Sequence, residues 1–310
     1  MGVKVFPKQQ VLSVLPKAGG GLAVGLMVAA MMGWMLLGSP ARSNTPVEYH
    51  GPRSAYGGGH PDLSGIWQTL STADWDLEAH PAAPGHFWQE GALGAQPAGP
   101  SVVEGKVIPY RPEALAQKKA NFENRFTADP YKLELGDPEF KCFSAGVPRS
   151  NYLPHPFQIL QTPRYVLFAY QYANTNRVVR IGGHTEAPVD SWMGWSNGHW
   201  EGETLVIDVT GFLGTEGWLD RAGNYTSDAL HVTERFRLID HDHLDYEATI
   251  DDPKVFTRPW KIHLPLYRRI EPNTHIIESK CQEFAEEALY GKLSKPGHDP
   301  AQANPAAITR

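Results

Sequence analysis

Alternation of apolar and polar residues dominates the chain from Phe157 onward and predicts a mainly β fold. The strand-like runs cover residues 157–161, 165–172, 177–181, 193–200, 204–210, 230–239, 244–251, 259–269 and 274–281. Short turns link many of these runs, and strands joined so closely form antiparallel hairpins. About nine strands in a meander tend to close, because closure removes unpaired edges. The pattern therefore predicts a single antiparallel β-barrel or a strongly curved meander sheet.

Two of the runs indicate how deeply their strands are buried. Residues 204–210 are apolar on one side, and the consecutive Val206 and Ile207 indicate burial on both faces of that strand. Residues 244–251 alternate strictly between apolar and polar side chains. That alternation is typical of a strand with one face in the core and the other in water.

One stretch has helical rather than strand periodicity. Residues 112–125 begin with proline and continue with good helix formers. The residues that share one face at helical spacing are Leu115, Ala116, Lys119 and Phe122. We expect this short helix to pack on the barrel through that face. Residues 80–111, which lack periodicity and hold several Pro and Gly, predict a long loop lying over the body.

The N-terminus carries an export signal. Lys4, Lys8 and Lys17 precede an uncharged, largely apolar run over residues 18–41, which predicts a cytoplasmic N-terminus and an exported body. The run has the length of a transmembrane helix, about 20 residues. Small residues at 39–41 also offer a cleavage site. We expect the body on the periplasmic side of the bacterial inner membrane, with this segment retained as a signal anchor or removed as a signal peptide.

Shifts in composition divide the chain into four parts. Residues 1–41 form the signal anchor or signal peptide, and residues 42–60, rich in Gly, Pro and Ser, predict a flexible tether. The periplasmic β-barrel domain is expected over residues 61–293. Residues 294–310 are expected to be disordered.

Composition narrows the possible partners and covalent links. The formal net charge of −6 offers no basic surface, so nucleic acid is not an expected partner. The two cysteines, Cys142 and Cys281, are too few for a disulfide scaffold or a Cys-rich zinc module. In an oxidising compartment they would form one disulfide, worth about 3–5 kcal/mol in the chain-entropy model. The alternative is a pair of free thiols.

Five short motifs resemble those of a known group of proteins. They are residues 62–67 (D-L-S-G-I-W), 142–149 (C-F-S-A-G-V-P-R), 200–206 (W-E-G-E-T-L-V), 220–223 (D-R-A-G) and 230–236 (L-H-V-T-E-R-F). Together they resemble a largely uncharacterised family of exported bacterial proteins with a lipocalin-like (calycin) barrel pattern. The resemblance covers about residues 61–285 and implies the barrel fold and export, but no established activity. The N-terminal run is longer than the leader that the resemblance implies.

A serine motif offers the first candidate chemistry. Residues 194–198 fit G-x-S-x-G, and the chain order Ser196, Asp220, His231 matches that of a hydrolase triad. The motif requires a strand before the serine and a helix after it. Here another strand pair follows, so a glycine-flanked bend at the barrel mouth is the favoured interpretation.

A polar set around Asp220 offers the second candidate chemistry. His231 would act as general base, Asp220 as its orienting group and Arg221 as a stabiliser of charge. On a strand over residues 230–239, His231 and Arg235 share one face, and Glu234 lies on the other. A polar interior face would suit a ligand cavity. The favoured alternative is an Asp220–Arg221 pair that locks the loop over residues 211–223.

Aromatic and histidine residues supply candidates for binding. Trp195, Trp218, His184 and Arg235 are the candidate ligand-binding residues, and core packing is the alternative for the tryptophans. His241 and His243 have a spacing found in metal sites but lie in an expected turn, so no metal site is predicted. His155 lies in a loop near a strand end and has no diagnostic spacing. No haem, phosphate-loop or dinucleotide motif is present, and no cofactor is expected.

Two functions remain open. The first is a membrane-anchored accessory or interaction subunit of a membrane complex, for example an electron-transfer or photosynthetic one. The second is a periplasmic acid–base enzyme (an isomerase, lyase or hydratase) or a carrier, acting on a small apolar ligand inside the barrel. The anchor-length N-terminus and the lack of a convincing nucleophile favour the first.

Overall fold

The structure, a computed structural model, describes residues 49–127, 136–214, 217–282 and 289. The expected signal segment and the expected C-terminal tail lie outside these residues. Within the described part of the chain, no helix is long and apolar enough to cross a membrane.

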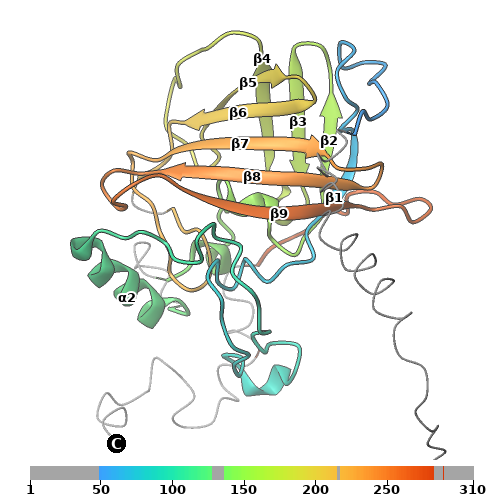
Figure 1. Ribbon diagram of the computed structural model, residues 1–310. Helices are drawn as coiled ribbons and strands as arrows, with labels where there is room; N and C mark the ends of the chain where they lie inside the picture. The colour runs from blue at the N-terminus through green and yellow to red at the C-terminus, as the bar shows by residue number, and fades with distance from the viewer. Residues whose placement is uncertain (1–48, 128–135, 215–216, 283–288, 290–310) are drawn as a thin grey trace, which may run out of the picture. The chain divides into compact units, whose positions relative to one another are not determined.

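Nine strands form one closed barrel (Figure 1). In chain order they are β1 (Gly65–Gln68), β2 (Phe157–Gln161), β3 (Tyr165–Tyr170), β4 (Asn176–Ile181), β5 (Trp195–Glu201), β6 (Thr204–Thr210), β7 (His231–Leu238), β8 (His243–Asp251) and β9 (Trp260–Arg268). Each strand pairs with its neighbours in sequence, and β1 pairs with β9 to close the ring. The predicted single β-barrel is confirmed.

The strand that closes the barrel differs from the one predicted. Residues 274–281 were expected as the ninth strand, but they form no strand. The ninth place is taken by β1, which pairs with both β2 and β9. Arg268 of β9 holds this seam, because its Nη1 donates to the Ser64 carbonyl at 2.6 Å and its guanidinium lies 4.3 Å from the Trp67 ring centroid. The terminal segment lacks a strand partner and is tethered by side chains and a disulfide instead.

One pair of neighbouring strands is parallel, so the prediction of an all-antiparallel meander is wrong at this point. β4 and β5 run in the same direction and pair at only three positions, from Val179 with Ser196 to Ile181 with Gly198. Residues 182–194 make the crossover that a parallel connection requires. Because the ladder is so short, Asn176–Val178 at the start of β4 have no partner on the β5 side.

Large apolar side chains fill the inside of the barrel. Five aromatic side chains from the strands are fully buried and belong to one core cluster: Trp67, Phe157, Phe168, Phe236 and Tyr246. Val206 and Ile207 are both buried, and β8 alternates between buried and half-buried residues, as the sequence predicts. Core side chains therefore fill much of the barrel interior.

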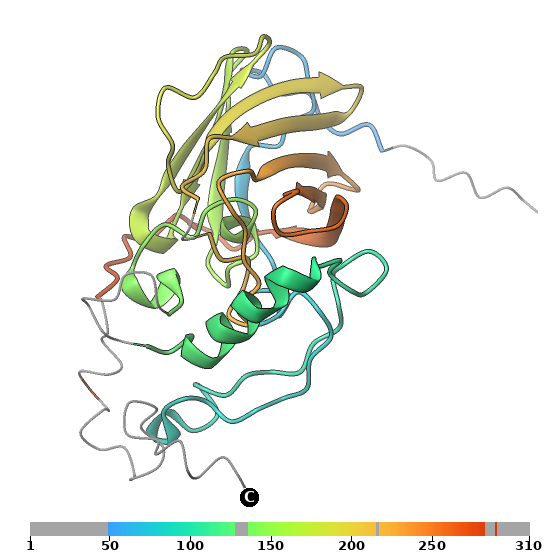
Figure 2. The same cartoon turned by 90° about the vertical axis from the view of Figure 1, so that its left-hand side faces the viewer.

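The short helix and the long loop lie together at the β9 side of the barrel (Figures 1 and 2). The loop is attached by isolated bridges from Val103 to Ile262 and from Tyr110 to Phe256. The helix α2 (Leu115–Asn124) follows a 3-10 turn (Pro112–Ala114) and confirms the predicted helix.

The face through which α2 packs differs from the prediction. Leu115 and Phe122, expected to face the barrel, are about half exposed at 50% and 46%. The buried residue of the helix is Asn121, whose Nδ2 donates to the carbonyl of Gly223 at 3.3 Å. Gly223 has a positive φ of 82°, and a Cβ there would meet the Phe122 backbone nitrogen at 2.7 Å. A polar contact against a glycine therefore sets the docking face.

The folded body begins before the predicted boundary at residue 61. Within the part of the predicted tether that the structure describes, residues 49–60, Arg53 pairs with Glu203 at 2.8 Å and forms a bridge to Pro61. The ring of His60 stacks on Trp200 at 4.7 Å. These residues are packed on the outer wall of the barrel.

Candidate functional site

A buried polar network lies inside the barrel. Glu234 points inward from β7 and accepts hydrogen bonds from Asn151 Nδ2 at 2.6 Å and from the Tyr246 hydroxyl at 2.8 Å. The other carboxylate oxygen of Glu234 pairs with Arg177 Nη2. The Tyr170 hydroxyl donates to Asn151 Oδ1 at 2.8 Å and extends the network to β3. We call this set, with Ser196, the interior network.

Burial and the ion pair shift the pKa values of three residues of the interior network, Arg177, Tyr170 and Tyr246. Burial disfavours the charge of Arg177, but the carboxylate of Glu234 raises the pKa of Arg177 above its ordinary value. Burial raises the pKa of both Tyr170 and Tyr246. The network is therefore a charged pair surrounded by neutral donors, and breaking it would leave a buried charge.

Ser196 belongs to this network and not to a hydrolase triad. Its hydroxyl accepts a hydrogen bond from Arg177 Nε at 2.8 Å and is buried. The neighbouring glycines have steric roles. Gly194 has a φ of +63°, and a Cβ on Gly198 would meet Val179 Cγ1 at 2.7 Å. G-x-S-x-G is therefore a bend and a close strand contact, as the favoured interpretation predicts.

An open cleft of about 560 Å³ lies where β4 and β5 separate. We call it the side cleft. It is lined by Ser144, Thr175, Asn176, Arg177, Val178, Arg180, Pro188, Val189, Ser191, Trp192, Met193, Gly194, Trp195 and Ser196. The start of β4, unpaired on this side, forms one wall. Pro188, Val189 and residues 191–196 form the other. Arg177 and Ser196 connect the cleft to the interior network.

A second buried cluster lies outside the strands. Arg149 pairs with three carboxylates, at 3.0 Å to Asp74, 2.7 Å to Asp137 and 2.7 Å to Glu139. Arg221 also pairs with Glu139, at 2.8 Å, and with Asp74, at 3.2 Å. We call these five residues the ion cluster. The predicted locking role of Arg221 fits these contacts, although its partners are Asp74 and Glu139 and not Asp220.

Charge balance sets the pKa values in the ion cluster. Burial alone would raise the pKa of Glu139, but the charges of Arg221 and Arg149 lower it to about 2. Burial, with the negative charge of Glu139, raises the pKa of Asp74 to about 6. The two arginines therefore stabilise Glu139 as a carboxylate, and the charge of Glu139 in turn opposes the ionisation of Asp74.

Asp220 organises its own loop. Its Oδ1 accepts hydrogen bonds from the backbone nitrogens of Ala222 and Asn224 at 3.0 and 3.2 Å. Its Oδ2 accepts from the Leu77 backbone nitrogen at 2.9 Å and from Asn224 Nδ2 at 2.6 Å. Burial and the charge of Asp76 raise the pKa of Asp220, while the donors oppose that rise. All four contacts tie chain segments together, which supports the structural alternative.

His231 is not brought to Asp220 or Arg221 by any described hydrogen bond or ion pair. Its Nε2 contacts Asp208 at 3.3 Å, and its side chain is 45% exposed. Arg235, on the same outward face of β7, pairs with Glu201 at 2.7 Å. The polar face of β7, which was expected to line the barrel interior, therefore faces outward. Strand alternation places Val232, Glu234 and Phe236 inside.

The remaining candidate residues are dispersed. Trp195 lines the side cleft, whereas Trp218 is buried and bridges to Tyr225. His184 is exposed and contacts Glu186 at 3.1 Å. His155 stacks on Tyr172 at 5.7 Å.

The two turn histidines do not form a metal site with other residues. His241 contacts Asp242, and His243 contacts Asp240. Among the described residues, no group of three or more His, Cys, Asp or Glu could hold a metal ion.

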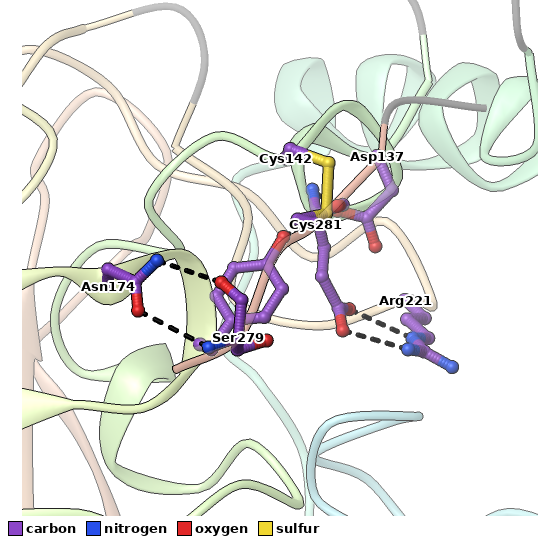
Figure 3. The surroundings of a disulfide bond; sticks show 8 residues. Asp137, Cys142, Asn174, Arg221, Ser279 and Cys281 are labelled. Carbon is purple, nitrogen blue, oxygen red and sulfur yellow. Dashed lines mark hydrogen bonds and ion pairs between the residues drawn. A yellow bond between two sulfur atoms is a disulfide. The ribbon is translucent and has the colours of Figure 1, made fainter. Parts of the chain in front are cut away.

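The predicted disulfide is confirmed. Cys142 and Cys281 are bonded, with their Cα atoms 5.6 Å apart (Figure 3). Asn174 adds a second attachment for the terminal segment, since its Nδ2 donates to the Ser279 carbonyl at 2.8 Å. Figure 3 shows the disulfide beside Asp137 and Arg221 of the ion cluster. Residues 274–281 were expected to form a strand. The disulfide instead fastens this segment to the loop that holds Cys142.

Glu234 was predicted only to face away from His231, and Arg177 was not predicted as a site residue. A signal for both was present. Glu234 stands between Val232 and Phe236, and Arg177 precedes Val179 by two positions, so each charge falls on the apolar face of its strand. Two opposite charges on inward faces predict a buried pair.

Comparisons with known proteins identify no related family or curated protein. A scan against protein-family models finds no match, and a search of curated proteins finds no significantly similar chain. The function must therefore be argued from the site.

Proposed function

We propose that this chain is a non-catalytic accessory subunit of a membrane complex and that its N-terminal segment holds it on the export side of the membrane. It binds its partner chain in the complex through the side cleft. One observation carries the proposal. Among the described residues, the lining of the cleft contains no His, Cys, Asp or Glu. A cleft without a general base or a metal ligand is suited to binding and poorly suited to acid–base chemistry.

The contacts of the candidate catalytic groups support the same view. Asp220 is occupied by four donors, Arg221 by Glu139 and Asp74, and His231 by Asp208 on the outer face. An acid–base enzyme would need the three in one site. Their separate contacts favour the accessory role over the isomerase, lyase or hydratase.

Apolar residues at the rim of the cleft also favour binding. Val189 is 72% exposed and Val178 is 45% exposed. Neighbouring exposed apolar side chains beside a cleft are typical of binding surfaces. The disulfide fits an oxidising compartment, which supports export.

Purification of the full chain from native membranes in detergent tests this function. We expect a stoichiometric partner chain to co-purify with the wild type and to be lost from Val189→Asp. Ile270→Asp is the matched control, because Ile270 is 71% exposed and is not among the residues that line the cleft. Recovery of the wild-type chain alone, or equal behaviour of the two variants, would contradict the proposal.

A further inference from the structure

Two tryptophans that line the side cleft are each held by neighbouring side chains. The indole Nε1 of Trp195 donates to Thr185 Oγ1 at 3.0 Å. Thr185 is itself fixed by Asn197, whose Oδ1 accepts from the Thr185 backbone nitrogen at 3.1 Å. Trp192 stacks on Phe143 with ring centroids 5.0 Å apart. Two tryptophans held in this way offer a preorganised surface for a flat apolar group.

The charge of the cleft is positive and unbalanced. Within the part of the chain that the structure describes, its charged lining residues are Arg177 and Arg180. Glu234 neutralises Arg177. Arg180 forms no ion pair with any described residue, and its guanidinium lies 3.7 Å from the Trp195 ring centroid. The cleft therefore presents one uncompensated guanidinium beside an aromatic wall.

The lining of the cleft contains donor groups, one of which has no hydrogen-bond partner. Arg177 has an Nη1 that is buried without a hydrogen-bond partner. The Ser144 and Thr175 hydroxyls lie 2.9 Å apart and bond to each other. A ligand with acceptor oxygens would find donors there, and a cationic ligand would find no carboxylate in the lining.

We propose that the side cleft binds a small aromatic carboxylate, with its carboxylate paired to Arg180 and its ring against the apolar wall. Guanidinium groups pair with carboxylates through two parallel hydrogen bonds, which matches a single free arginine. The cleft volume of about 560 Å³ falls in the range of small-molecule sites. This inference rests on the proposed function, because both assign binding to the side cleft.

Calorimetric titration of 2-naphthoate into the full-length chain in detergent tests the proposal. We expect saturable binding, weakened by at least about tenfold in Arg180→Gln, because the only unpaired charge of the cleft is lost. Arg235→Gln, which removes an arginine from the outer face of β7, should leave the affinity unchanged. The neutral analogue 2-acetonaphthone should bind at least about tenfold more weakly than 2-naphthoate.

Two variants of an exposed residue at the rim of the cleft test the proposal with little risk of misfolding. Val189→Lys and Val189→Asp alter a side chain that is 72% exposed, so neither disturbs the core. We expect the lysine to strengthen 2-naphthoate binding and the aspartate to weaken it, each by about threefold or more at low salt, with smaller effects at high salt.

Four results would overturn the inference. They are no saturable binding, equal affinity for the neutral analogue, no change in Arg180→Gln, and displacement of 2-naphthoate by equimolar inorganic phosphate. If 2-naphthoate fails to bind while Val189→Asp still releases a partner chain, the ligand assignment is wrong and the accessory role stands. If 2-naphthoate binds as expected and no partner chain co-purifies, the ligand site stands without that role.

Discussion

The guanidinium of Arg180 on β4 lies 3.7 Å from the ring centroid of Trp195 on β5. This contact spans the parallel strand pair next to the point where its short ladder ends. The separation of the two strands exposes both side chains to the side cleft. A topological irregularity of the barrel thus creates the surface that we assign to binding.

Loss of the interior charge pair should destabilise the barrel. Glu234→Gln leaves Arg177 buried without a counter-charge, and we expect the free energy of unfolding to fall by about 3–5 kcal/mol. Urea denaturation followed by circular dichroism measures the change. Arg235→Gln, at the next position but on the outer face, is the control and should change the free energy by less than about 0.5 kcal/mol.

The double variant Arg177→Met with Glu234→Leu distinguishes the contribution of the ion pair to stability from the contribution of side-chain packing. Replacing a buried ion pair by apolar residues of similar volume is often neutral. We expect the double variant to be more stable than Glu234→Gln. If the double variant is as unstable as Glu234→Gln, the Arg177–Glu234 pair contributes to the free energy of unfolding by more than the neutralisation of two buried charges.

The glycines of G-x-S-x-G should matter for packing. In Gly198→Ala the new Cβ would lie 2.7 Å from Val179 Cγ1 and 2.9 Å from Ile181 Cδ1. We expect a loss of about 1–3 kcal/mol in the free energy of unfolding through overpacking. The control is Gly202→Ala, where φ is +58° but no atom lies within 4 Å. That variant should show only backbone strain, about 1 kcal/mol, and a larger loss there than at Gly198 would argue against the steric explanation.

Removal of the disulfide should lower stability without unfolding the barrel. The bond joins residues separated by 139 positions, and the chain-entropy model gives a contribution of about 3–5 kcal/mol. We expect Cys142→Ser with Cys281→Ser to unfold at lower urea concentration. Reduced wild type serves as the matched comparison. A double variant as stable as the oxidised wild type would show that the tether is dispensable.

Acid should weaken the ion cluster through Glu139. Its pKa of about 2 in the folded chain lies below the ordinary 4.5. A carboxyl whose pKa falls on folding stabilises the folded state fully above its unfolded pKa, and that stability is lost as the pH falls through the folded pKa. From this group we expect a loss of up to about 3 kcal/mol in the free energy of unfolding between about pH 5 and pH 2.

Glu139→Gln is the test of that assignment and should show a shallower decline over the same range. Asp74 acts in the opposite sense, because its pKa rises from 3.8 to about 6 on folding. Its contribution is present at low pH and is lost as the pH rises through that interval. Denaturation series on the wild type and on Glu139→Gln therefore need points on both sides of pH 4. Parallel curves would contradict the role given to Glu139.

Strand periodicity was sufficient to predict the barrel, because half-buried strands such as β8 follow a strict two-residue alternation. The closing strand was not predictable in this way. Gly65–Gln68 has only four residues, too few to show a period, and its place depends on distant partners in β2 and β9. The parallel β4–β5 pair depends equally on the path of a loop, which leaves no local signal.

The candidate site was predictable only in part. Trp195 was identified from its residue type, and the structure places it in the side cleft. Arg180 was not identified, because its importance comes from the absence of a carboxylate partner, which only the tertiary arrangement reveals. A structural role was favoured for the Asp220 loop, but its contacts with Leu77 and Asn224 could be found only in the folded structure.

Hydrogen–deuterium exchange of the full-length chain, with and without 2-naphthoate, tests most directly the claim that the side cleft is the binding surface. We predict that the ligand slows exchange in the segments 176–181 and 188–197, which contain most of the residues that line the cleft, and leaves β7 and β8 unchanged. Arg180→Gln should abolish that protection. Protection confined to other segments, or protection that persists in Arg180→Gln, would contradict the account.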